Sequence, residues 1–105
     1  MSIEVRQLEP KVVWNYFEDL NAVPRPSKKE ERVIEFVKQF GESLNLDTIV
    51  DAAGNVVIKK PATPGMEDRP IVVLQSHLDM VHQKNKAVDF DFSTQGIQSY
   101  IDGEW

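Results

Sequence analysis

The apolar run Ile71–Leu74 constrains the fold of this chain more than any other stretch of its sequence. The run is rich in β-branched residues and follows Pro70, a combination typical of a short buried strand. A strand that is apolar on both faces usually belongs to a sheet covered by helices. The sequence therefore predicts an α/β fold with a central strand over Ile71–Ser76.

Two polar residues, His77 and Asp79, follow this predicted strand. Residues two apart on a strand share a face, and ligands collect at strand ends in open α/β sheets. An imidazole beside a carboxylate makes a supported metal ligand, because the carboxylate takes one ring N–H and leaves the other nitrogen to bind the metal. The alternative is a hydrogen-bonded pair that closes the strand end without any metal.

Two helices are expected before this strand. The first begins near Pro10, ends at Pro24 and has a core-facing apolar stripe formed by Val13, Trp14, Phe17 and Leu20. The second begins with a capping box of Ser27 and Glu30, and its buried stripe contains Val33, Val37, Phe40 and Leu44. Arg25, between them, is interpreted as a surface residue rather than as a contact for a substrate carboxylate.

Three further short strands are predicted, at Thr48–Val50, Val56–Lys59 and Ile97–Ile101. The first two form an antiparallel hairpin around Gly54. A long loop is predicted after the central strand, and loops that leave the end of a strand often line a site. The predicted architecture is two amino-terminal helices packed on a small mixed β-sheet, in a single domain over residues 1–105.

The composition narrows the function classes. With 17 acidic against 12 basic residues, the net charge of −5 argues against nucleic acid or an anionic membrane surface as a partner. The absence of cysteine excludes disulfides, a thiol nucleophile and cysteine-based zinc sites. No apolar stretch looks like a signal peptide or a membrane span, so the chain is expected to be cytoplasmic.

The histidine content limits the metal chemistry that this chain can perform alone. Catalytic zinc needs three protein ligands, and a two-metal site needs more. The only two histidines, His77 and His82, are five residues apart, which fits neither a strand pair nor a helical pair. A self-contained site is not expected, and His82 is interpreted as a non-ligand. Ser76 and His77 point to opposite faces of a strand, so they form no nucleophile pair.

The sequence around the predicted strand resembles the metal-binding strand of the aminoacyl-histidine dipeptidases, also called Xaa-His or cytosol nonspecific dipeptidases. These enzymes are a branch of the two-zinc aminopeptidase/aminoacylase superfamily. The resemblance lies in Leu74–Val81 and Gln83–Asn85, and it continues in Pro24–Glu31, Asp51–Val56, Asp89–Phe90 and Tyr100–Trp105.

The resemblance implies zinc-dependent hydrolysis of Xaa-His dipeptides, including β-alanyl-histidine, and of other unblocked dipeptides by a homodimer. It implies two zinc ions, or cobalt or manganese in their place. It assigns His77 as a ligand of one metal and Asp79 as the catalytic-site aspartate that orients it. The other ligands and the glutamate base would lie beyond Trp105. The chain is therefore expected to be an amino-terminal, incomplete piece of a zinc-exopeptidase catalytic domain, inactive alone and without tightly bound zinc.

Two alternatives stay open at this point. The isolated chain could be an inactive fold fragment or a self-associating module that pairs an uncovered sheet edge with a second copy. It could also be an unrelated small α/β binding domain, which a deeply buried His77 would favour.

Overall fold

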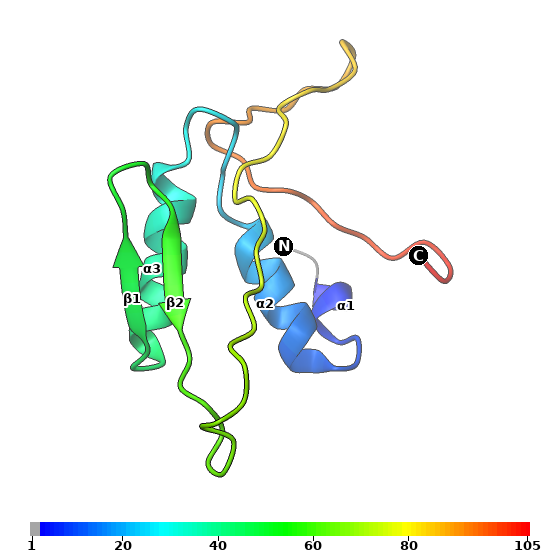
Figure 1. Ribbon diagram of the computed structural model, residues 1–105. Helices are drawn as coiled ribbons and strands as arrows, with labels where there is room; N and C mark the ends of the chain where they lie inside the picture. Colours follow the sequence, from blue (N-terminus) through cyan, green and yellow to red (C-terminus); the bar gives the residue numbers. More distant parts are fainter. Residues whose placement is uncertain (1–2) are drawn as a thin grey trace. The chain divides into compact units, whose positions relative to one another are not determined.

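The structure is a computed structural model that describes residues 3–105, and these form three helices and one two-stranded antiparallel sheet (Figure 1). In chain order the elements are α1 (Ile3–Arg6), α2 (Lys11–Asn21), α3 (Glu31–Ser43), β1 (Asp47–Val50) and β2 (Val56–Lys59). The chain divides into two compact units. One contains the chain up to Val33 together with Asp79–Trp105, and the other is Ile34–Leu78. The predicted α/β class is confirmed.

The unit Ile34–Leu78 is built from most of α3 and the hairpin of β1 and β2. The hairpin has the predicted antiparallel pairing, with Asp47 opposite Lys59, and Figure 1 shows it running beside α3. Gly41 permits this close approach, because a Cβ at that position would meet Thr48 Oγ1 and lie 3.0 Å from Ile58 Cγ1.

The carboxylate of Asp51 closes the turn between β1 and β2. Its Oδ1 accepts the backbone N–H groups of Ala53 and Asn55, and its Oδ2 accepts Asn55 Nδ2, all at 2.9 Å. Gly54 adopts the left-handed conformation of the turn, with φ of +89°. The hydrogen bonds from Asn55, followed by those from the other turn amides, lower the pKa of Asp51 because they favour the charged carboxylate.

Acid should weaken this turn. A pKa that is lower in the folded chain than in the unfolded chain contributes stability above the unfolded value, near pH 4, and this contribution is lost as the pH falls through the folded value. The difference in unfolding free energy between the wild type and Asp51→Asn should therefore shrink as urea unfolding is repeated from pH 7 down to pH 2. A carboxyl carbon of Asp51 that titrates by NMR at the ordinary pKa would contradict this expectation.

In the other unit, the side chain of Arg6 joins α1 to α2. Arg6 Nη1 donates to Asn15 Oδ1 at 3.0 Å, and Arg6 Nη2 pairs with Asp19 Oδ1 at 2.8 Å. Asn15 Nδ2 donates back to the carbonyl of Arg6 at 3.3 Å. The helix α1, which the sequence analysis did not anticipate, is therefore held by polar contacts and by Val5, which is buried.

The buried residues of α2 are polar ones, Glu18 and Asn21, rather than the predicted apolar stripe. The segment that follows residue 95 covers them: Ser99 Oγ donates to Glu18 Oε1, and the Ile97 N–H donates to the Asn21 carbonyl at 2.7 Å. Of the predicted stripe, Val13 and Phe17 are exposed. The prediction that this stripe forms the core is therefore wrong for these two residues, because the segment that packs on α2 contacts a different face of it.

The strand predicted at Ile97–Ile101 is also wrong, since this segment is irregular. Its first N–H bonds to the end of α2 instead of to a neighbouring strand. The sheet is purely antiparallel and not mixed, because within the described part of the chain it contains only β1 and β2.

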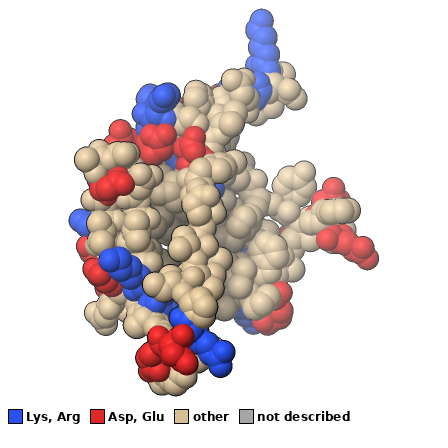
Figure 2. Space-filling model, in the orientation of Figure 1, with Lys and Arg blue, Asp and Glu red and all other residues tan. Residues whose placement is uncertain are grey.

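Among residues 3–105, no helix is long and apolar enough to cross a membrane. On the face drawn in Figure 2, Lys and Arg side chains alternate with Asp and Glu side chains, and no large area carries a single sign of charge.

Candidate functional site

The segment that carries His77 is irregular in this structure. Residues 71–77 are all exposed, with Ile71 and Leu74 exposed by 92% and 93%, and they belong to no helix or strand. The predicted central strand Ile71–Ser76 is therefore wrong as a description of this chain. A strand needs a neighbouring strand for its N–H and C=O groups, and none of the described elements pairs with this segment. His77 itself is exposed.

Asp79 lies where two distant segments of the chain pair. Pro26 and Met80 form a parallel bridge, in which the Met80 N–H donates to the Arg25 carbonyl at 2.8 Å and the Ser27 N–H donates to the Met80 carbonyl at 3.0 Å. Next to this bridge, Ser27 Oγ donates to Asp79 Oδ2 at 2.6 Å. The carboxylate of Asp79 is thus held by a side chain 52 residues earlier in the sequence.

Arg25 supplies a positive charge beside this carboxylate. Partial burial of the guanidinium lowers the pKa of Arg25, and the negative charge of Asp79 opposes this shift. Arg25 stays protonated at any working pH, because an arginine side chain is effectively always charged in a protein. Arg25, which was interpreted as a surface residue, is half-buried in the structure.

The predicted capping box of Ser27 and Glu30 does not form. The helix α3 starts at Glu31, and the side chain of Glu30 accepts the N–H of Lys28 at 2.8 Å. Both described hydrogen bonds of the Ser27 hydroxyl go to the segment of Asp79 and Met80. The same residue pattern therefore serves a tight turn and a long-range contact, which spacing along the sequence could not distinguish from a cap.

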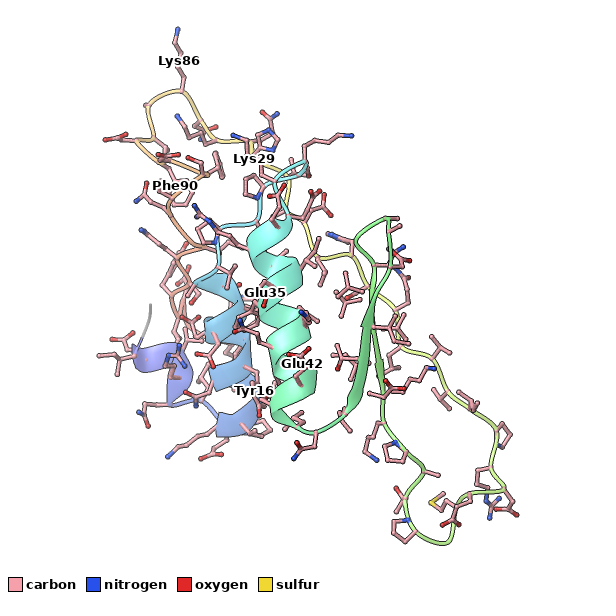
Figure 3. The ribbon with its side chains drawn as sticks, turned by 90° about the vertical axis from the view of Figure 1, so that its left-hand side faces the viewer. Tyr16, Lys29, Glu35, Glu42, Lys86 and Phe90 are labelled. Atoms are coloured by element: carbon pink, nitrogen blue, oxygen red, sulfur yellow. The ribbon has the colours of Figure 1, made fainter. Side chains whose placement is uncertain are left out.

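The loop after Met80 turns back through an aromatic cluster. The rings of Phe90 and Phe92 meet edge to face with centroids 4.9 Å apart, and the ring of His82 lies 6.2 Å from that of Phe92. Figure 3 shows Lys86 at the tip of this loop, pointing outward, while Phe90 lies further back. The rings of Phe90 and Phe92 contribute to a pocket of about 370 Å³ with largely apolar walls.

The residues present could supply part of the ligand set of a zinc site but not all of it. The structure describes no group of three or more His, Cys, Asp or Glu side chains that could hold a metal between residues 3 and 105. What it does provide is an exposed imidazole and, two residues on, a carboxylate whose position is fixed. The assignment of His77 as a ligand and of Asp79 as its partner stays a prediction.

Comparison with known proteins connects this arrangement to peptidases. No protein-family model matches the chain. Over 102 residues the chain is 45% identical to the cytosol non-specific dipeptidase of Escherichia coli (strain K12), covering 97% of this chain and 21% of that protein. Its structure matches the crystal structure of aminoacylhistidine dipeptidase from Vibrio alginolyticus with a TM-score of 0.91 and 46% identity, over 96% of this chain and 21% of that one.

The fold and the segment around Asp79 are thus shared with a class of hydrolases, the dipeptidases. The expected resemblance to the aminoacyl-histidine dipeptidases in particular is confirmed over nearly the whole chain. The chain spans about a fifth of the length of these relatives, since it covers 21% of each. The alternative of an unrelated binding domain is wrong.

Proposed function

We propose that this chain forms the part of a metal-dependent dipeptidase that contributes one metal-binding histidine, His77, together with the aspartate that orients it, Asp79. The observation that carries the proposal is the structural match to an aminoacylhistidine dipeptidase over 96% of the chain at 46% identity. The exposure of His77 and the anchoring of Asp79 by Ser27 support the two roles.

The finer parts of the proposal extend the family resemblance of the sequence. The substrates are unblocked dipeptides, Xaa-His and β-alanyl-histidine among them, in an enzyme that acts as a homodimer in the cytosol. The metal is zinc, in a two-ion site that other divalent ions such as cobalt or manganese can fill. Because the described residues provide only part of the ligand set, the role we assign to this chain is to contribute one metal-binding side chain.

A chimera tests this proposal. The 102 matched residues of the Escherichia coli dipeptidase are replaced by the corresponding residues of this chain, and hydrolysis of a Xaa-His dipeptide is measured with zinc present. We expect activity within about tenfold of the parent enzyme, because the two sequences are 45% identical over these residues and cores tolerate substitutions that keep volume and pattern. The 105-residue chain assayed alone should hydrolyse no dipeptide. A chimera that folds and dimerises like the parent but is inactive would refute the proposal.

A further inference from the structure

The Ser27 hydroxyl is committed to the segment that carries Asp79. The distance of 2.6 Å from Ser27 Oγ to Asp79 Oδ2 is that of a hydrogen bond to a charged oxygen. The Ser27 backbone N–H bonds the next carbonyl along that segment, from Met80. Two bonds from one residue to adjacent positions fix both the segment and the rotation of the carboxylate.

We propose that Ser27 is a positioning residue for the metal-binding segment: it holds the Asp79 carboxylate in one orientation, so that Asp79 can orient His77. This inference rests on the proposed function. A carboxylate that supports a ligand imidazole must itself be held, since the outer hydrogen bonds decide where its acceptor oxygens point.

The conformation of the turn around Ser27 helps to orient this hydroxyl. Lys28 has φ of 76°, a left-handed conformation that is unfavourable for a residue with a side chain. Two hydrogen bonds hold the turn in place: the Lys28 N–H donates to Glu30 Oε1 at 2.8 Å, and the Lys29 N–H donates to the Pro26 carbonyl at 2.9 Å. Strain that is maintained by its surroundings often marks a functional site. Here it directs Ser27 Oγ toward Asp79 and not toward the first turn of α3.

A double-mutant cycle on the 105-residue chain tests the contact without any metal. Unfolding is measured for the wild type, Ser27→Ala, Asp79→Ala and the double variant. We expect the two residues to be coupled by about tenfold in the unfolding equilibrium constant, the size of a hydrogen bond to a charged group at a half-buried position. Additive effects of the two substitutions would overturn the inference.

The chimera defined above tests the functional role. Ser27→Ala should lower kcat by about tenfold and leave KM within about twofold, because the outer bond acts on the ligand and not on substrate binding. Ser27→Thr, which keeps the hydroxyl, should restore kcat. The matched control is Ser93→Ala, which removes another serine–aspartate hydrogen bond of 2.6 Å, to Asp91, and should leave kcat unchanged.

The outcomes separate the two proposals. An inactive wild-type chimera overturns the proposed function, and this inference falls with it. An active chimera in which Ser27→Ala matches the wild type overturns this inference alone. Equal losses in Ser27→Ala and Ser93→Ala, or a loss that threonine does not restore, would show a structural role only and would overturn it as well.

Discussion

In the chimeric dipeptidase, His77→Ala should lower kcat/KM by more than about 100-fold, because it removes the side chain that we propose as a direct ligand of the metal. Asp79→Asn should lower kcat/KM by about 10- to 100-fold, since it keeps the shape of the side chain but removes the charge that is proposed to orient the imidazole. Equilibrium dialysis against zinc should show a reduced metal content for His77→Ala at the same protein concentration. The loss is expected to be larger for His77→Ala, because the proposed contact of His77 with the metal is direct and that of Asp79 is indirect.

The chain provides a matched control in its only other histidine, His82. Its ring packs 6.2 Å from that of Phe92, and no metal role is assigned to it. His82→Ala should therefore change kcat/KM by no more than about twofold, the effect of a typical surface substitution. Loss of activity in His82→Ala together with near-normal activity in His77→Ala would reverse the assignment and refute the proposed ligand.

Local signals in the sequence predicted local structure well. The hairpin of β1 and β2 has the expected strands and turn, because short runs of β-branched residues and a glycine-containing turn act over a few residues. The helices α2 and α3 also lie close to where apolar periodicity and prolines placed them. These features depend on neighbours in the sequence, so the sequence alone suffices to find them.

Features that depend on distant partners were predicted poorly. The run Ile71–Leu74 has the composition of a buried strand, yet it is exposed here. A strand also needs a neighbouring strand to accept and donate its hydrogen bonds, and none of the described strands pairs with this run. The burial of Glu18 was missed for a related reason. A carboxylate on a helix normally predicts a solvent-facing position, and the contact of Glu18 with Ser99 comes from a distant part of the sequence.

The candidate site shows the same division. Resemblance to a family pointed to His77 and Asp79, which lie together in one short motif. Ser27 was instead interpreted as a helix cap, because serine followed three residues later by glutamate is the ordinary signature of one. A signal for its contact with Asp79 would be a pairing between residues 52 positions apart, and a single sequence contains no such information.

Gly96→Ala should lower the free energy of unfolding by about 3 kcal/mol, the combined cost of overpacking and of a lost hydrogen bond. A Cβ on Gly96 would meet the Asn21 carbonyl oxygen and lie 2.8 Å from both Cα and the carbonyl carbon of Ala22. These are backbone atoms at the end of α2, so no side-chain rotation can relieve the contact. The segment after Gly96 would have to move away and would give up the bond from the Ile97 N–H to Asn21.

Hydrogen exchange localises this effect, and a second glycine controls for it. In Gly96→Ala the Ile97 amide should lose its protection, whereas the amides shared between β1 and β2 should keep theirs, because the hairpin belongs to the other compact unit. Gly65→Ala introduces a side chain at φ of +88° with nothing within 4 Å, so it should cost only about 1 kcal/mol of backbone strain. If the two variants were equally stable and the Ile97 amide stayed protected, close packing of residue 96 on α2 would not hold this segment, and the covering of Glu18 would need another cause.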